Sequence, residues 1–384
     1  MNRRKFIKTI GSTGLVVAAS GFGLSQCDQM PNEAVQAWQG PAQNLTDREW
    51  ILSYALLAPN PHNMQPWLAD LREEDTITLH IDGDRLLPHT DPYGRQILIG
   101  QGTFLELLSI AAKERGYKTH ITLFPDGAPD TDSLNIHKKA VARIELIKNS
   151  TLTKDPLFSA ILARRSNKTP YREEYLSQEH IENLSSLEMP TTQSLSFAAT
   201  EKTVAPHKKF AERAMLLEME TPRTLMESID RTRIGADEIR KNPDGIDLHG
   251  PMFWWLKNLG MMTPEKASKP GTFAYQGGID YALGWVEGTF NMGWLTTSDN
   301  SREAQVNAGR SYVRLNLLAT QLGVSMHPVS QILQEYPEMR PLQDEFNEHV
   351  GVKAEEKVQM YFRIGYQKRP NPSPRRKLTD ITRA

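Results

Sequence analysis

Cysteine is nearly absent from this sequence, since Cys27 is the only one among 384 residues. An intrachain disulfide needs two thiols, so the folded chain must rely on its core. A single thiolate also cannot hold an iron–sulfur cluster. The ten histidines are scattered, with no closely spaced pair on one helix face, so the sequence offers no metal site.

An excess of charge of one sign is lacking as well. The chain carries 45 Lys and Arg against 46 Asp and Glu, a net charge of −1, which gives no argument for a nucleic-acid partner. Its hydrophobic content of 39% and charged content of 24% are ordinary for a folded protein. The length therefore indicates one large or two medium globular units.

The sequence also lacks a long hydrophobic run. The apolar stretch 14–24 is too short and too rich in glycine to span a membrane well. It follows Arg3, Arg4 and Phe6, an order typical of a twin-arginine (Tat) export signal, which we predict over residues 1–27. A surface amphipathic segment is the alternative. The mature protein is then expected in the periplasm or at the outer face of the cytoplasmic membrane, after passage through the Tat translocase.

Cys27 and the export route each add one expectation. Cys27 resembles a lipoprotein processing site, which would anchor the chain by a lipid, although Gln26 is bulkier than the residue usual before such a cysteine. A leftover thiol in a removed peptide is the alternative. The Tat route carries folded proteins, commonly because a cofactor is inserted in the cytoplasm. Without thiolates or a metal motif, a non-covalent organic cofactor is the remaining candidate.

The segment 58–67, Ala-Pro-Asn-Pro-His-Asn-Met-Gln-Pro-Trp, is the most informative part of the chain. Its three prolines remove backbone donors and exclude both a helix and a central strand, so it predicts a stiff loop. Asn60, Asn63 and Gln65 offer amide donors and acceptors to a flat ligand with polar edges. An ordinary helix-terminating turn, with Trp67 as a core anchor, is the alternative.

A cationic segment follows at residues 164–168, Arg-Arg-Ser-Asn-Lys, at the end of a predicted helix. Arginine donates in pairs and lysine adds a point charge, so the segment can cradle a phosphate. A charged helix end that faces water is the alternative. Arg375 and Arg376 in the tail either add a cation to the same anion or form a solvated terminus.

An internal repeat appears when the chain is shifted against itself by 207 positions, which brings Arg95 onto Arg302. In the same window Gly102, Leu108, Ala112, Gly116 and His120 fall on Gly309, Leu315, Ala319, Gly323 and His327. Both copies predict an apolar helix that begins near an arginine and stops at a glycine. Two similar amphipathic helices are the alternative to a duplicated α+β unit.

The apolar periodicity predicts strands over 76–81, 119–123, 140–147, 194–198, 290–295 and 358–364. It predicts helices over 47–57, 103–115, 156–163, 178–186, 207–220 and 304–322. Each half therefore has helices around a small sheet. We divide the chain into a linker (28–43), a first half (44–150) and a second half (151–384), which carries a lid-like insertion at about 245–285 and a basic, proline-rich tail (368–376).

The proline–amide loop, the Arg-Arg-Ser segment and the glycine-bounded helices together resemble the nitroreductase superfamily of FMN-dependent flavoproteins, over residues 45–376. The fused double arrangement with an export signal resembles its Acg-like branch, some members of which share a lid over the flavin site. The resemblance implies an α+β fold, an α/β/α sandwich that in the family forms an intertwined homodimer with FMN at the interface. Here the first half carries only the ring motif and the second half only the phosphate motif. We therefore expect two degenerate repeats that form an intrachain pseudo-dimer with one FMN per chain.

The resemblance also implies roles for single residues. The phosphate would be held by Arg164, Arg165, Ser166 and Lys168, with Arg375 or Arg376 completing the site. The isoalloxazine ring would lie against Pro59, Asn60, Pro61, His62, Asn63 and Gln65, where Asn60 and Pro61 replace serines common in the family. The loop that the family places near flavin N5 would contain His327, Pro328 and Val329.

If the protein is an enzyme, the resemblance implies that hydride passes through flavin N5 to a nitro, quinone or other conjugated small-molecule acceptor. No catalytic acid or base is expected; His62 and His327 are candidates, but a packed or flavin-contacting histidine explains them equally well. Export removes the nicotinamide donor, so either a membrane redox partner supplies electrons or the protein binds and sequesters FMN without turnover. A cofactor-free structural or adhesion protein is a third class.

Overall fold

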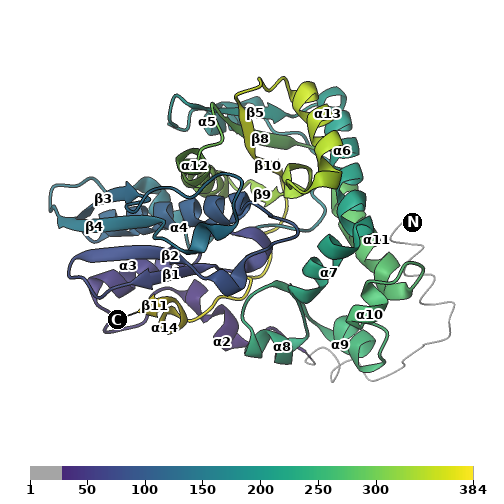
Figure 1. Cartoon of the computed structure of the whole chain (residues 1–384), viewed down its shortest axis with the longest axis horizontal. Coiled ribbons are helices and arrows are strands. Elements are labelled where there is room, and N and C mark those ends of the chain that lie inside the picture. The colour runs from purple at the N-terminus through teal and green to yellow at the C-terminus, as the bar shows by residue number, and fades with distance from the viewer. Residues whose placement is uncertain (1–27, 384) are drawn as a thin grey trace.

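The computed structural model describes residues 28–383, so the predicted export signal and Cys27 lie outside the described residues. Two main sheets, each with its own helices, meet through a central pair of helices, α4 (Arg95–Glu114) and α12 (Arg302–Gln321) (Figure 1). A capping box at Thr46 and Glu49 starts helix α3 (Asp47–Ala55). The predicted α+β class is confirmed.

The first-half sheet has the strand order β11-β1-β2-β4-β3. Its strands are β1 (Trp67–Asp70), β2 (Thr76–Ile81), β3 (Tyr117–Leu123), β4 (Ala142–Lys148) and β11 (Thr382–Arg383). The second-half sheet has the order β5-β8-β10-β9. Its strands are β5 (Gln193–Ala198), β8 (Met292–Thr297), β9 (Ser325–Pro328) and β10 (Lys357–Gly365). In both sheets two strands precede the central helix and two follow it, in the same antiparallel order, as a duplicated unit requires.

Between β5 and β8 the second half carries an excursion that the first half lacks, since only residues 71–75 separate β1 from β2. Its elements are α6 (Glu201–Glu220), α7 (Pro222–Asp230), β6 (Thr232–Ile234), α8 (Ala236–Lys241), β7 (Ile246–Leu248), α9 (Pro251–Asn258), α10 (Pro264–Ala267) and α11 (Phe273–Glu287). The predicted lid-like insertion, 245–285, is the later part of this excursion. Strands β6 and β7 form a separate parallel pair.

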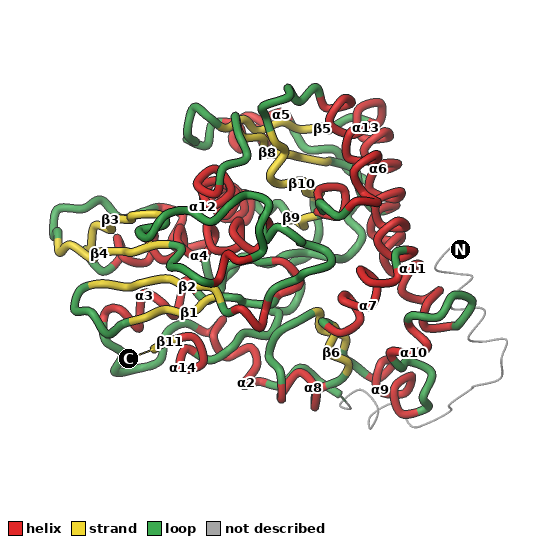
Figure 2. Tube along the Cα trace, viewed as in Figure 1, coloured by secondary structure: helices red, strands yellow, loops and turns green. Residues whose placement is uncertain are grey.

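The remaining helices complete the two units. They are α5 (Gln178–Ser185), α13 (Arg340–Val350), α14 (Leu378–Ile381) and the 3₁₀ turns η2 (Pro61–Asn63), η3 (Gly83–Arg85), η4 (Asn135–His137), η5 (Pro156–Ala160), η6 (Ser330–Leu333) and η7 (Pro337–Met339). Residues 28–43, expected to be a linker, contain α2 (Asn32–Val35) and η1 (Gln36–Gln39), whose Trp38 is 7% exposed and belongs to the first-half core. After β10 the chain runs without regular structure (Figure 2) back to the first half, where β11 pairs in parallel with β1.

Helices α4 and α12 meet at equivalent positions of the repeat. A Cβ on Gly102 would lie 1.9 Å from the carbonyl oxygen of Val306, and a Cβ on Gly309 would lie 1.9 Å from that of Ile99. The same shift of 207 positions relates both members of each contact. Only glycine allows two helix backbones to approach this closely. The contact is therefore reciprocal, as in the predicted pseudo-dimer.

The arginines that begin the two helices reach across the molecule in the same reciprocal way. Arg95 in the first half donates to the carbonyl oxygens of Leu333 (2.6 Å) and Gln359 (3.0 Å) in the second. Arg302 in the second half donates to those of Tyr93 (2.9 Å) and Asp130 (2.6 Å) in the first. Both arginines are 1% exposed. Each half thus supplies a buried cation to the other.

Candidate functional site

The proline–amide loop lies on α4, and three residues of that helix hold it. Thr103 donates from its hydroxyl to the Pro59 carbonyl oxygen (2.7 Å), and Gln101 donates to that of Pro66 (2.9 Å). Gly100 leaves room for the loop, because a Cβ there would meet Asn60 at 3.3 Å. The loop is therefore positioned by the helix that also forms the contact between the two halves.

Three residues of this loop have left-handed backbone angles: φ is 48° at His62, 54° at Asn63 and 52° at Gln65. Such angles are unfavourable for side chains other than glycine and asparagine and persist where the surroundings fix them. Part of that restraint is internal, since the Asn60 carboxamide oxygen accepts from the Gln65 backbone N–H at 2.7 Å. The loop is a rigid, strained platform, a feature that concentrates at ligand sites.

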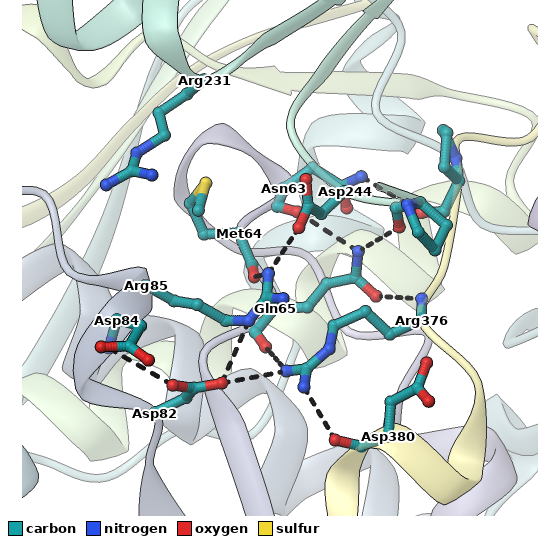
Figure 3. A network of polar contacts seen from close by, with 12 residues as sticks. Asn63, Met64, Gln65, Asp82, Asp84, Arg85, Arg231, Asp244, Arg376 and Asp380 are labelled. Atoms are coloured by element: carbon teal, nitrogen blue, oxygen red, sulfur yellow. Dashed lines mark hydrogen bonds and ion pairs between the residues drawn. The ribbon is translucent and has the colours of Figure 1, made fainter. Parts of the chain in front are cut away.

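Gln65 connects the loop to two distant segments (Figure 3). Its Nε2 donates to the carbonyl oxygen of Pro243 at 2.9 Å, and its Oε1 accepts from the Arg376 backbone N–H at 2.8 Å. Gln65 is fully buried. Asn63 is engaged in a similar way, since its Oδ1 accepts from Arg375 at 2.7 Å and its Nδ2 donates to the Pro374 carbonyl oxygen at 3.1 Å. Both side-chain amides thus bind protein groups.

Charged groups around Gln65 extend this network (Figure 3). Arg85 donates to the Met64 carbonyl oxygen (3.0 Å) and pairs with Asp244 of the excursion (2.5 Å). Arg376 donates to the Gln65 carbonyl oxygen (3.0 Å) and lies 3.5 Å from Asp82. Loop, excursion and C-terminal tail are therefore joined in one polar network.

A cluster of three arginines is packed around the Trp38 ring. The guanidinium carbons of Arg165, Arg375 and Arg164 lie 4.0, 4.9 and 5.5 Å from its centroid. The Trp38 indole N–H donates to the carbonyl oxygen of Ser373 at 2.9 Å. The cluster, which we call the arginine cluster, brings together the second-half segment, the tail and residues just after the predicted signal.

The arginine cluster forms no ion pair with the described part of the chain, although the charge of Asp247 acts on Arg375. No carboxylate of residues 28–383 forms an ion pair with Arg164, Arg165 or Arg375. Within the same range the Nε atom of each is buried without a hydrogen-bond acceptor. Burial lowers the pKa of Arg164 and of Arg165 to about 10, and lowers that of Arg375 well below its ordinary value. Buried, mutually repelling cations of this kind call for an anion.

A second group of polar side chains surrounds His62. Burial, followed by the charges of Lys168 and Arg231, lowers the pKa of His62 to about 4, and its Nδ1 has no partner within residues 28–383. The side chain of Lys168 makes no hydrogen bond or ion pair in that part of the chain, but its charge acts on His62, His327 and Asp247. His62 is therefore neutral near pH 7 in a cationic surrounding.

His327 is held from the second half. Its Nδ1 accepts from Arg363 Nε at 2.9 Å, so the neutral ring carries its proton on Nε2. Burial, then the charges of Arg363 and Lys168, lowers the pKa of His327 well below its ordinary value. Arg363 is fully buried, stacks over Tyr171 at 4.3 Å and donates to the carbonyl oxygen of Asn167 at 2.8 Å. This frame fixes the tautomer of His327.

The structure brings together most of the residues that the sequence singles out, but not all. Ser166 is exposed and forms a backbone bridge to Met326, and Val329 belongs to the second-half core. Pro328 lies in β9, opposite Phe362 of β10. Arg376 belongs to the Gln65 network rather than to the arginine cluster.

Sequence reasoning missed Trp38, Arg363 and Asn167. Trp38 falls in a segment that carries no family motif. Arg363 lies in an ordinary strand. Asn167, to which the sequence assigns no role, is 1% exposed, and its Nδ2 donates to the carbonyl oxygen of Lys368 at 3.0 Å. In none of the three does the sequence show a periodicity or spacing that would have marked a site.

Comparison with known proteins gives a partial match. No family model matches the chain. A curated protein of Mycobacterium tuberculosis named "Putative NAD(P)H nitroreductase acg" is 32% identical over 120 residues, 31% of this chain and 34% of that protein. Over that stretch the chain is similar to a protein that is named as a nitroreductase. An uncharacterized protein of the same species is 33% identical over 121 residues, 30% of this chain and 33% of that protein. The match thus spans about a third of these relatives.

Solved structures give only distant likenesses. A nitroreductase-like family protein from Bacillus cereus has 16% identity and a TM-score of 0.32, covering 59% of this chain and 95% of that chain. A nitroreductase with bound FMN from Bacteroides fragilis has 12% identity and a TM-score of 0.34, covering 58% and 95%. Likenesses this distant carry no argument about function.

Proposed function

We propose that this chain is an FMN-dependent, nitroreductase-like oxidoreductase that holds one FMN between its two halves. One observation carries the proposal: the buried guanidinium groups of Arg164 and Arg375 and the half-buried one of Arg165, each with a buried Nε that has no acceptor in residues 28–383, form no ion pair with a carboxylate of that range beside a strained loop. A phosphate dianion would satisfy their donors and offset their repulsion, so the residues present fit the phosphate end of FMN.

In this proposal Arg164, Arg165 and Arg375 hold the phosphate, and the loop at 59–63 lies against the ring. The bound flavin supplies the hydride chemistry at its N5. Because Asn63 and Gln65 already bind the tail and the excursion, their part is to hold the loop in place. Ser166 and Arg376 have their places at the edge of the site rather than within it.

The charged groups near the ring have a separate part. Lys168 and Arg231 place positive charge beside His62, which favours the build-up of negative charge on a bound electron carrier. His327 presents Nε2–H as a fixed donor. No residue is assigned as a catalytic acid or base. The proposal also includes export through the Tat translocase and a periplasmic site of action. Its electron donor would be membrane-bound, and its acceptor would be a nitro or quinone compound.

The test begins with the flavin content of the protein purified after cytoplasmic expression with excess FMN. We expect one FMN per chain. Arg165→Gln is the sharpest variant, because within residues 28–383 the Arg165 side chain donates to two neighbouring carbonyl oxygens alone, those of Leu162 and Arg164, and its loss disturbs the fold least. FMN affinity should fall at least about tenfold, because the variant loses a charge-assisted hydrogen bond to the phosphate. Arg115→Gln, whose guanidinium lies 4.7 Å from the Trp50 ring, is the matched control. Two FMN per chain, or equal losses in both variants, would count against the composite site.

A second candidate function, FMN binding without turnover, is supported by how closed the arginine cluster is. Arg164 is 1% exposed and Arg375 is 4% exposed under Trp38 and the tail. Anaerobic reduction of the holoprotein by small donors, followed by nitroaromatic or quinone acceptors, separates the two. In an enzyme the reduced flavin is reoxidised by the acceptor. In a sequestering protein the flavin keeps the redox state that it had before the reagent was added.

A further inference from the structure

Helix α9 is strongly apolar, yet none of its side chains is buried. It contains Met252, Phe253, Trp254, Trp255 and Leu256 in succession. The four-residue helix α10 that follows also has no buried side chain. A helix of this composition inside a domain ordinarily turns its apolar stripe to the core.

The exposed apolar surface of the described chain is concentrated in this part of the excursion. Of the nine large hydrophobic side chains that are exposed in residues 28–383, six lie within 252–281. These are Met252 (48%), Trp255 (39%), Leu259 (54%), Met261 (36%), Phe273 (40%) and Tyr281 (53%). Clustered exposure of this kind marks an interaction surface, whereas single exposed residues are normal.

Polar contacts at its base attach α9 to the rest of the excursion. The carboxylate of Asp28 accepts from the Ala236 N–H (2.6 Å) at the start of α8 and from the Gly250 N–H (3.0 Å) at the start of α9. Lys257 of α9 pairs with Glu238 of α8 at 2.5 Å. The helix is therefore held by polar contacts, while Met252 and Trp255 remain exposed and Phe253, Trp254 and Leu256 are half-buried.

Asp28 also fixes where the preceding chain joins the folded part. The 27 residues before it, which include the apolar stretch 14–24, are joined to the molecule at the base of α9. Any attachment of those residues to a membrane would bring α9 to the same surface. Within residues 28–383 no helix is both long and apolar enough to cross a bilayer, so α9 can lie on it but not span it.

We propose that the apolar face of α9–α11 is a docking surface for a phospholipid bilayer. Tryptophan, methionine, leucine and phenylalanine enter the boundary between head groups and acyl chains, where Trp is favoured. The exposed lysines Lys266 and Lys269 on and beside α10 lie level with the head groups. The proposal does not depend on flavin binding.

Flotation of the full chain with vesicles tests this surface. All proteins carry Cys27→Ser, which removes any acylation at that residue. The wild-type sequence should float with phosphatidylcholine vesicles, and more with vesicles containing phosphatidylglycerol. Because the contact is mainly apolar, binding to phosphatidylcholine should persist in high salt. The triple variant Met252→Ser, Trp255→Ser, Leu259→Ser should lower the vesicle partition coefficient at least about tenfold, since it removes three apolar side chains from the interface.

The control variant is Ile147→Ser with Tyr175→Ser, two side chains exposed by 49% and 43% outside the patch. It should bind like the wild type, and circular dichroism should show all variants folded. The proposal is overturned if the full chain does not float. It is also overturned if the triple variant floats as well as the wild type, because the attachment then runs through residues 1–27. A third contrary result is a concentration-dependent dimer without lipid that the triple variant abolishes, because the face then binds a second copy.

Discussion

At the scale of single residues, the arrangement of Trp38 explains how three arginines without carboxylates can be buried together. Its ring offers a negative π face to three guanidinium groups at 4.0–5.5 Å. This attraction offsets part of their repulsion and holds the three guanidinium groups around one ring. Trp38 thereby positions the residues that we propose to hold the phosphate, without binding it.

Replacing Trp38 by Phe should weaken FMN binding while leaving the protein folded. The smaller ring loses the indole bond to the Ser373 carbonyl oxygen and part of the cation–π attraction, so we expect about a tenfold rise in the FMN dissociation constant, measured by fluorescence titration. Trp50→Phe is the matched control, because Trp50 also lies under a guanidinium, that of Arg115, at 4.7 Å. Equal effects of the two changes would show that Trp38 acts only through general stability.

The neutral state of His62 should make the flavin-free protein less stable in acid. Its folded pKa of about 4 lies below its ordinary 6.5, so between these values the unfolded chain binds the proton first. The stability that the neutral His62 contributes is fully present above pH 6.5 and is lost as the pH falls toward 4. The resulting decrease in unfolding free energy is at most about 3 kcal/mol. His62→Gln should therefore flatten the fall in unfolding free energy over this range, measured by denaturant titration at several pH values.

The other histidines with lowered pKa provide the background for this experiment. His207, whose Nδ1 lies 2.9 Å from the Tyr361 hydroxyl, and His327 also have lowered pKa values. Both histidines therefore lower the unfolding free energy as pH falls, in the wild type and in the His62 variant alike. Only the difference between wild type and variant belongs to His62. Parallel curves would mean that the pKa of His62 is the same in the folded and the unfolded protein.

At the scale of elements, the contact between α4 and α12 depends on two glycines. Gly102→Ala and Gly309→Ala each place a Cβ 1.9 Å from a backbone oxygen of the opposite helix, which neither helix can relieve without moving apart. We expect each change to lower the unfolding free energy by several kcal/mol, as overpacking in cores does at its upper end. Thermal unfolding followed by circular dichroism measures it.

Gly284→Ala supplies the control for this pair. Gly284 lies in α11, its added Cβ would meet nothing within 4 Å, and alanine favours a helix by about 1 kcal/mol, so this variant should be unchanged or slightly more stable. The reciprocal geometry also predicts similar losses at Gly102 and Gly309. A loss confined to one of them would contradict an equivalent role in the two halves.

The elements themselves could largely be predicted from the sequence, and the exceptions have physical reasons. The strand at 76–81 was predicted with its observed bounds, because its alternation is regular. Helix α4 was predicted from residue 103 but begins at Arg95. Gly100 and Gly102 weaken the helical pattern in the sequence, but the close packing that they allow offsets their cost to the helix. Helix α6 begins at Glu201 and continues through Pro206, where a helix boundary was expected. In both cases tertiary packing overrides local propensity.

At the scale of the whole molecule, the complementary motifs of the two halves predicted that loop 58–65 and segment 164–168 would meet. In the structure Arg164 of this segment donates to the carbonyl oxygen of Leu57 (2.9 Å), the residue directly before the loop, and Arg375 of the tail donates to the same oxygen (3.3 Å). The return of the tail to the first half and the closure by Trp38 could not be predicted. Both depend on contacts between residues more than 300 positions apart, which leave no local pattern.

A site built from both halves and both ends of the chain should couple FMN binding to unfolding of the whole molecule. Separating the halves breaks the arginine cluster, so flavin release and loss of helical structure should coincide in one thermal transition. FMN at a hundredfold excess over its dissociation constant should add about 2.7 kcal/mol of stability, and riboflavin at the same concentration much less, because it lacks the phosphate. Circular dichroism and flavin fluorescence, recorded in parallel, measure both effects. Two separate transitions, only one of them shifted by FMN, would place the flavin within a single half and exclude the composite site.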